Sequence, residues 1–268
     1  PAGDDVARNV LGDEPPVPMV YEWFTLDGQA FSSSEGHVVL VEDVLELLEP
    51  EVVRFFFAKN PKKARDFSIE RLDQLVDEFD RFEQCYFGEV EGTEDELARA
   101  ERVYPFVVDE VDPDRIRLPF TFAAVLGMFD DPDLREQVAR KEGHLPDDAD
   151  EETVEAALAR VERARNWARR TDNEFNYELK RAELPDVDLD PATEDALDEL
   201  ADFVAEGHDG DAIQGEIYET AKRNDMEIGG LFTAGYRLFF DEEQGPQLGT
   251  FLGKLDRDFV VARLRRER

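Results

Sequence analysis

Apolar residues along most of the chain recur with the period of an α-helix. From Ile69 to Tyr86 they lie three and four positions apart over about five turns, which predicts an amphipathic helix that ends at Gly88 and Gly92. Other stretches with helical patterning predict helices at 42–48, 94–102, 118–130, 132–141, 151–181, 192–206, 209–224, 227–241 and 256–266. We therefore expect a mostly α fold.

Strand-like alternation is limited to the beginning of the chain. Residues 19–31 alternate apolar and polar around Gly28, which is typical of a short hairpin or of a strand followed by a loop. A loop of serine and glycine follows at 32–37, and the next short helix should stop at Pro50. This part of the sequence predicts a small α/β segment ahead of the helices.

Two acidic segments that contain proline, 146–150 and 184–191, have the composition of linkers. Helical patterning also takes over after residue 68. These changes predict three units, at 1–68, 69–185 and 186–268. The last of them should be a helical bundle.

Charge narrows the range of functions. The chain carries 31 basic and 66 acidic residues, a formal net charge of −35 at pH 7. This balance excludes a generally basic nucleic-acid binder and argues against a protein of anionic membrane surfaces. Hydrophobic residues make up 41% of the chain, too many for a disordered acidic protein. No run of about 18 apolar residues is present, so we expect no membrane span.

The kind of acidity points to a salt-rich environment. Only 7 of the basic residues are lysines, and the acidic residues are spread along the whole chain. Such an acidic coat repels itself at low salt and is screened at high salt, as in the cytoplasm of a halophile. An ordinary acidic protein of a mesophile is the alternative. The chain begins at Pro1 with no signal-like segment, so we expect a cytoplasmic protein and a C-terminal piece of something longer.

Cysteine and histidine chemistry is sparse. The single cysteine, Cys85, excludes an intrachain disulfide and a multi-cysteine zinc site, and its place on an apolar helix face predicts burial. The histidines His37, His144 and His208 are far apart and border glycine or polar residues. We expect loop positions for them and no metal site.

Three hydroxyls stand together in the loop at Ser32, Ser33 and Ser34. Hydroxyl and backbone N–H groups in such a loop can cradle phosphate oxygens. Serine-rich tight loops are more often only loops, and Glu35 has the wrong charge for a phosphate cradle.

A basic patch stands out against the acidic background. It consists of Lys59, Lys62, Lys63 and Arg65, and so holds three of the seven lysines. Lysine and arginine position phosphates without reading sequence, which favours contact with an RNA backbone. The alternative is a solvated turn that balances neighbouring acids.

The helix predicted at 151–181 carries a second basic group. Arg160, Arg163, Trp167 and Arg170 form a stripe that we place opposite the apolar face of this helix. Arginine can pair with phosphate and tryptophan can stack on a base, so the stripe predicts an RNA surface. Ion pairs within the helix and ordinary packing of the tryptophan are the alternative. The run Tyr236, Arg237, Phe239 and Phe240 could face a base, but such a run is more often core.

The segment Gly28–His37 resembles the second signature loop of class I aminoacyl-tRNA synthetases. Leu48–Phe55 and Asp66-Phe67 resemble the continuation of that loop in archaeal class I lysyl-tRNA synthetase. So does the C-terminal run from Ile213 to Gly249. The resemblance extends from Met19 to Arg268.

The resemblance implies a reaction and a set of partners. Lysine would be activated by ATP, with Mg²⁺, to an adenylate and then transferred to tRNA, and the signature loop would stabilise charge on the leaving pyrophosphate. The loop positions that match the signature and would bind ATP are Ala30, Phe31, Ser32, Ser33 and Ser34. Ala30 and Ser33 stand where the signature has lysine.

The family's first signature, His-x-Gly-His or a close relative, is absent from the sequence. We therefore expect this chain to be inactive alone. It would supply the signature loop (1–68), a helical connecting domain (69–185) and a helical anticodon-binding cage (186–268). ATP and lysine would be bound through an N-terminal half. The alternatives are a non-catalytic tRNA-binding or assembly module and a fragment of a glutamyl-tRNA synthetase-like enzyme.

Overall fold

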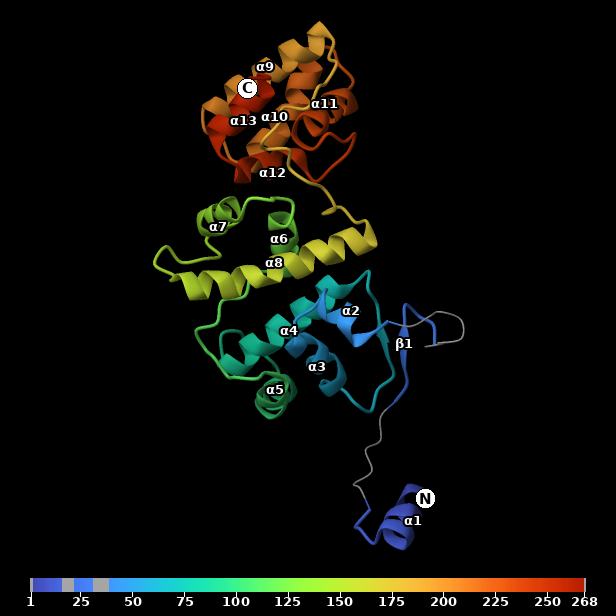
Figure 1. Cartoon of the computed structure of the whole chain (residues 1–268). Coiled ribbons are helices and arrows are strands. Elements are labelled where there is room, and N and C mark those ends of the chain that lie inside the picture. Colours follow the sequence, from blue (N-terminus) through green and yellow to red (C-terminus); the bar gives the residue numbers. More distant parts are fainter. Residues whose placement is uncertain (1, 16–21, 31–38, 268) are drawn as a thin grey trace.

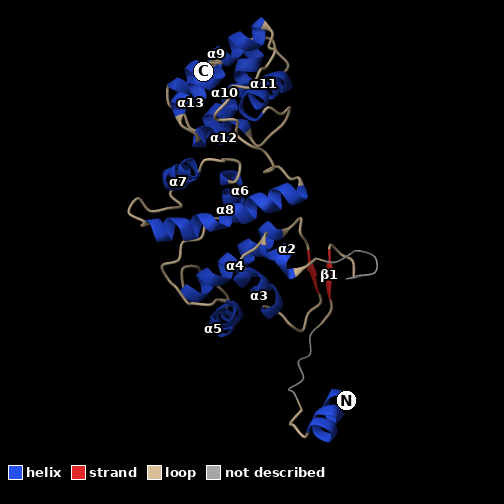
Figure 2. Cartoon of the chain, viewed as in Figure 1, coloured by secondary structure: helices blue, strands red, loops and turns tan. Residues whose placement is uncertain are grey.

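The computed structural model describes residues 2–15, 22–30 and 39–267. Within these ranges helices dominate, and the only strands form one short pair (Figure 2). The mostly α fold with a small α/β segment is therefore confirmed at this level.

The helices follow the hydrophobic pattern closely, with short pieces at the N-terminal end (Figure 1). They are α1 (Ala2–Val6), the π-helix η1 (Ala7–Leu11), α2 (Val41–Leu45), α3 (Pro50–Ala58), α4 (Leu72–Phe87), α5 (Glu94–Val107), α6 (Phe120–Leu126), α7 (Pro132–Lys141), α8 (Glu151–Thr171), α9 (Pro191–Ala205), α10 (Gly210–Arg223), α11 (Ile228–Phe240), α12 (Leu248–Lys254) and α13 (Arg257–Leu264). Gly88 ends α4 in the left-handed conformation, with φ of 73°.

The strand pair differs from the expected hairpin. β1 (Phe24–Leu26) pairs in parallel with β2 (Arg65–Phe67), about 40 residues later in the chain. The turn at Gly28 is present: Leu26 and Gln29 bond to each other across it, and Asp27 and Gly28 have φ of 49° and 76°. Because the second strand of a parallel pair comes from a distant segment, local alternation could not predict it.

Pro50 separates two helices. The short helix before it, α2, ends at Leu45, and Pro50 itself begins α3, where its missing N–H costs nothing. Val52, Phe55 and Phe56 of α3 are buried. This helix therefore carries much of the core beneath the strand pair.

Helix α8 ends ten residues before its predicted end. Asp172 takes the left-handed conformation, with φ of 48°, and stops the helix. The chain then runs on without regular structure, and the backbone N–H groups of Leu179 and Lys180 donate to the carbonyls of Met128 and Phe239 at 2.9 and 2.8 Å. This segment thus joins α6 to α11 through backbone contacts that no local pattern encodes.

Helix α12 was not predicted. It contains Gly249 and Gly253, and such a short glycine-containing run gives little helical signal. A Cβ on Gly249 would lie only 2.2 Å from the backbone nitrogen of Gln214 in α10. The glycine therefore permits close packing of two helices.

The helices α9–α13 pack on one another and form one end of the molecule (Figure 1). Arg263 is buried among them and donates to the carbonyls of Glu183, Leu238 and Arg181 at 2.8, 3.0 and 3.1 Å. Lys141 of α7 donates to the carbonyls of Gly253 and Leu255, and so joins α7 to the end of α12. No helix in the described part of the chain is both long and apolar enough to cross a membrane.

We expect the fold to require salt. With a net charge of −35, self-repulsion should weaken the compact state at low ionic strength, whereas in 1 M salt the Debye length falls to about 3 Å. Circular dichroism and thermal unfolding from 0.1 to 3 M KCl should show that helicity and the unfolding midpoint rise together. Each kcal/mol gained in the free energy of unfolding should raise the midpoint by roughly 2–4 °C. Full helicity at 0.1 M KCl with an unchanged midpoint would contradict this prediction.

Candidate functional site

The base of the proposed signature loop is attached to β2. The Asp66 carboxylate accepts hydrogen bonds from the Thr25 hydroxyl at 2.6 Å and from the Gly28 N–H at 2.7 Å. These two donors, the hydroxyl first, hold the pKa of Asp66 below its ordinary value. The Asp27 N–H donates to the Phe67 carbonyl at 3.0 Å. The chain therefore enters the loop from a turn that is fixed at three points.

Of the proposed ATP-binding positions, only Ala30 is described, and it is exposed. Phe31, Ser32, Ser33 and Ser34 lie outside the described residues. His37 does too.

The basic patch divides into two pairs. Lys59 pairs with Glu78 and lies over the Phe55 ring at 5.2 Å. Arg65 donates to the carbonyls of Phe56 and Phe57 and lies over the Phe56 ring at 5.0 Å. Arg65 thus holds the start of β2 against the end of α3, and Lys59 joins the end of α3 to α4.

The second pair, Lys62 and Lys63, is exposed. Their side chains form no ion pair or hydrogen bond with any described residue. Each of the other five lysines has a polar partner: Lys59, Lys141, Lys180, Lys222 and Lys254. The turn that carries Lys62 and Lys63 is fixed at its start, because the Glu22 N–H donates to the Pro61 carbonyl at 3.1 Å. These two cations are therefore available to a ligand.

The expected basic stripe on α8 is wrong for two of its four members. Arg160 and Trp167 are each only 3% exposed. Helical periodicity explains this outcome, because residues 160 and 167 share a face with the buried Ala157 and Ala164. Both therefore point into the protein and not toward solvent.

The other two members lie nearer to solvent. Arg163 is half-buried and donates to the Ala159 carbonyl at 3.2 Å, while Arg170 is exposed. Only Arg170 presents a free guanidinium of the kind that the stripe requires.

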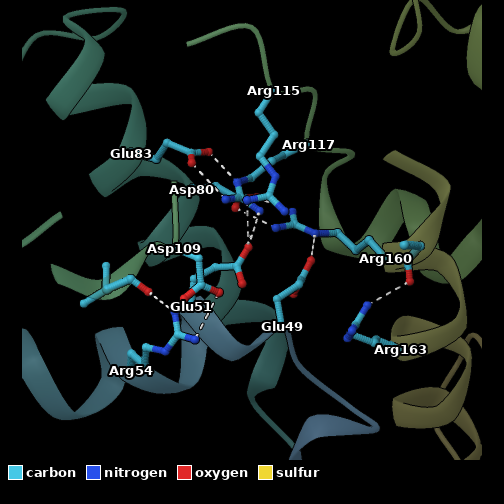
Figure 3. Close-up of polar contacts among 12 residues, drawn as sticks. Glu49, Glu51, Arg54, Asp80, Glu83, Asp109, Arg115, Arg117, Arg160 and Arg163 are labelled. Atoms are coloured by element: carbon cyan, nitrogen blue, oxygen red, sulfur yellow. Dashed lines mark hydrogen bonds and ion pairs between the residues drawn. The ribbon is translucent and has the colours of Figure 1, made fainter. Parts of the chain in front are cut away.

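Arg160 is the centre of a buried ion-pair network (Figure 3). Its guanidinium donates to Glu49 at 2.5 Å, to both carboxylate oxygens of Asp80 at 2.6 and 2.9 Å, and to the Leu118 carbonyl at 2.7 Å. Burial is the largest single effect on the pKa of Glu49 and raises it, but the charge and the hydrogen bond of Arg160, a backbone hydrogen bond and the charge of Arg117 together outweigh burial, so this pKa lies below its ordinary value. For Asp80 burial prevails and the pKa is raised. One cation thus joins α8 to α3 and α4.

A second buried arginine extends the network. Arg117 donates to Glu83 at 2.5 and 2.9 Å and contacts Glu51 at 3.3 Å (Figure 3). The buried Tyr104 hydroxyl also donates to Glu83, and Arg115 pairs with Glu51 at 3.2 Å. The hydrophobic pattern alone did not predict that these acids are buried. The signal available was that Glu83 falls on the apolar face of α4.

Helix α8 is bonded to the segments that precede α3 and follow β2. Besides the Arg160–Glu49 pair, Asn166 donates to the Glu46 carbonyl at 3.1 Å, and the Trp167 indole N–H donates to the Ile69 carbonyl at 2.8 Å. In Figure 1, α8 lies between the α2–α5 region and the C-terminal helices. Two of the residues expected to face RNA, Arg160 and Trp167, are therefore used to fix α8 to the α2–α4 region.

The aromatic run in α11 belongs to the core, as the more common interpretation held. Phe239 and Phe240 are buried, and the Tyr236 hydroxyl donates to the Pro246 carbonyl at 2.9 Å. Arg237 pairs with Glu243 at 2.6 Å. No base-facing surface is made by these residues.

The remaining candidates are structural. Cys85 is buried, as expected. His144 packs on Phe122, and His208 stacks on Phe203 at 3.8 Å. Among the described residues no group of three histidine, cysteine, aspartate or glutamate side chains is arranged to hold a metal ion.

Comparison with known proteins supports the resemblance found in the loop. Residues 1–108 match a family model described as "tRNA synthetases class I (K)". The chain is 68% identical over 266 residues to the lysine–tRNA ligase of Haloarcula marismortui, covering 99% of this chain and 49% of that protein. It is 69% identical over 269 residues to that of Halobacterium salinarum, again with 49% of the relative covered. With the ligase of Pyrococcus horikoshii it shares 35% identity over 282 residues, 99% of this chain and 52% of the relative.

Over nearly its whole length the chain is similar to one half of these class I lysine–tRNA ligases. It spans about half the length of the curated lysine–tRNA ligases it matches. The two most similar of these three ligases come from halophilic archaea, in agreement with the acidic, lysine-poor composition.

Proposed function

We propose that this chain supplies the signature loop and the tRNA-binding body of a lysine–tRNA ligase. The proposal rests first on similarity to lysine–tRNA ligases along 99% of the chain. In the reaction, the lysine carboxylate attacks the α-phosphorus of ATP and pyrophosphate leaves. A hydroxyl at the 3′ end of tRNA then attacks the carbonyl carbon of the adenylate, so that the lysyl group passes to tRNA and AMP is released. The protein would act in the cytoplasm.

The ATP side of the proposal is the loop that begins at Ala30. Hydroxyls of Ser32 and Ser34 would donate to phosphate oxygens, and Phe31 and Ser33 complete the match to the signature. Because alanine and serine replace both signature lysines, charge on the phosphates must be offset from elsewhere. Mg²⁺ would accompany the ATP phosphates as part of the substrate.

The tRNA side is carried by the free lysine pair. Lys62 and Lys63 are exposed, have no side-chain partner among the described residues, and lie on the turn that leads directly into the strand bearing Asp66. Phosphate contacts at this turn would place tRNA beside the base of the signature loop. Arg170, and to a smaller extent Arg163, remain candidates on α8. Arg160 and Trp167 are not among them, and Lys59 and Arg65 would act by holding the turn.

We assign one role in the ligase to each of the three units predicted from the sequence. Residues 1–68 would be the end of the catalytic domain, 69–185 a connecting domain, and 186–268 the anticodon-binding domain. The network around Arg160 supports a rigid connection between the first two, since it joins Glu49 to Asp80 through α8.

The reaction is tested by lysine-dependent exchange between ATP and pyrophosphate. We expect no exchange by the 268-residue chain alone, because the first signature is absent. A mixture with a separate polypeptide comprising the uncovered half of the Haloarcula ligase should exchange with lysine and not with glutamate. Exchange by the chain alone would refute the expected division of labour. Exchange with glutamate only would favour the glutamyl alternative, and tRNA binding without exchange in the mixture would favour a non-catalytic module.

A further inference from the structure

We infer that one face of the β1–β2 pair, the face that carries Trp23, Thr25 and Asp66, is the docking surface for the part of the ligase that this chain does not cover. The inference rests on the proposed function, in which this chain is one part of a longer enzyme. The face is defined by the strand register, in which Thr25 lies beside Asp66.

The opposite face of the pair is already covered. Successive residues of a strand point to opposite faces, so Phe24 and Phe67 lie on the side away from Thr25 and Asp66. The Phe57 ring meets Phe24 edge-on at 5.4 Å, and the Phe56 ring meets Phe67 in the same way at 5.3 Å. Helix α3 therefore covers this face with aromatic rings.

The second face carries an exposed tryptophan. The Trp23 carbonyl accepts the Arg65 N–H at 3.1 Å, so residue 23 continues the ladder and its side chain shares a face with Thr25. Trp23 is 84% exposed, whereas the only other tryptophan, Trp167, is 3% exposed. A single exposed apolar side chain is ordinary in itself, but this one stands on a face of a parallel strand pair, where its exposure requires a reason.

The physics of parallel sheets supplies that reason. Parallel strands occur with both faces covered, and two strands alone are too few for an independently stable sheet. Among the described residues the sheet has only two strands, and α3 covers only one face. We therefore interpret the strand pair as the edge of a larger sheet that other strands and helices complete.

The face is also held in a fixed conformation. Asp66 binds both the Thr25 hydroxyl and the Gly28 N–H, so the two strands and the turn cannot shift against each other without breaking these bonds. A surface that is ordered before it binds loses less conformational entropy on association.

The length of the relatives identifies the occupant. The chain covers 49% of the Haloarcula and Halobacterium ligases, so a similar length of polypeptide lies outside it in each relative. A segment of that size can provide the further strands and the covering helices that a parallel sheet needs. A second copy of this chain would have to cover the face with a surface that is itself strongly acidic.

Fluorine NMR tests the inference directly. The 268-residue chain, labelled with 5-fluorotryptophan, should give two resonances, assigned with Trp23→Phe. Titration with the unlabelled other half of the Haloarcula ligase in 2 M KCl should shift the Trp23 resonance and leave that of Trp167 in place. Sedimentation should show a one-to-one complex, which Trp23→Ser weakens at least tenfold.

Phe106→Ser is the matched control, because Phe106 is 82% exposed at the end of α5, and it should leave binding unchanged. Three results would each overturn the inference. They are binding by Trp23→Ser as tight as that of the parent, the absence of any complex, and a shift of the Trp23 resonance that is caused by self-association of the chain. If the separate half does not fold, the two parts are joined in one polypeptide. In the joined polypeptide, the Trp23 resonance must lose its solvent isotope shift between H2O and D2O, because the covered side chain no longer contacts water. Retention of this isotope shift would overturn the inference. A complex that shows the shift but no exchange leaves the docking surface standing and refutes the proposed function.

Discussion

Replacing Arg160 with methionine is expected to lower the free energy of unfolding by about 3–5 kcal/mol. The Arg160 side chain is 3% exposed and donates to Glu49, to Asp80 and to the Leu118 carbonyl. Methionine fills a similar volume but leaves the buried carboxylates of Glu49 and Asp80 without their main counter-charge, since Arg117 acts on them more weakly. Urea unfolding in 2 M KCl measures the free energy of unfolding.

The control for this variant is Arg170→Met. Arg170 is exposed on the same helix, so its replacement changes net charge equally and should alter stability by no more than about 0.5 kcal/mol. Equal stability of the two variants would show that the network contributes nothing beyond its packing.

The pH dependence of the Arg160 variant has a defined sign. In the parent, the pKa of Glu49 lies below its ordinary value, so its stabilising contribution is present above the unfolded pKa and is lost as pH falls through the folded pKa. Without Arg160, burial is opposed only by smaller effects, a backbone hydrogen bond at Glu49 and the charge of Arg117 at both Glu49 and Asp80, so we expect both pKa values to rise. Protonation then relieves the buried charges. The stability difference between parent and variant should therefore shrink from pH 7 toward pH 4.

Periodicity predicted the helices well but not which of their charged residues are buried. Helices α4, α9 and α11 lie within a few residues of their predicted ranges, because each has a single broad apolar face. Arg160 was assigned to the surface because charged side chains are normally exposed. Its three acceptors come from segments far apart in the chain, so only the tertiary structure brings them together.

The loop region shows the same limit. The sequence predicted the turn at Gly28, since this turn depends on residues close together. It did not predict that β2 would hold that turn, because Asp66 lies 38 residues from Gly28. It also grouped Lys59 and Arg65 with Lys62 and Lys63, although aromatic rings and carbonyls of α3 occupy the first two. Proximity in sequence indicated a basic patch, but side-chain partners determine which of its cations are free.

Changing Lys62 and Lys63 to glutamate is expected to weaken tRNA binding by roughly tenfold or more at every salt concentration at which the protein is folded. The double change removes two phosphate partners and adds two negative charges at the same turn. In the parent, two effects of salt oppose each other. Added salt weakens each phosphate contact through counterion release, and it also screens the acidic coat of net charge −35. We expect the second effect to prevail, so parent affinity should rise from low salt toward molar KCl.

Fluorescence anisotropy with labelled tRNA measures the affinity of the variant and of the parent across a KCl series. The series is limited to KCl concentrations at which circular dichroism shows a fully helical protein. The matched control is Arg99→Glu with Arg102→Glu on α5, which changes net charge by the same amount away from the Lys62–Lys63 turn. A general field effect would weaken both variants alike, whereas a phosphate site at the turn would weaken only the lysine variant. If the Lys62/Lys63 variant binds tRNA as tightly as the parent, these lysines form only a solvated turn, and the contact with RNA must be made by other residues such as Arg170.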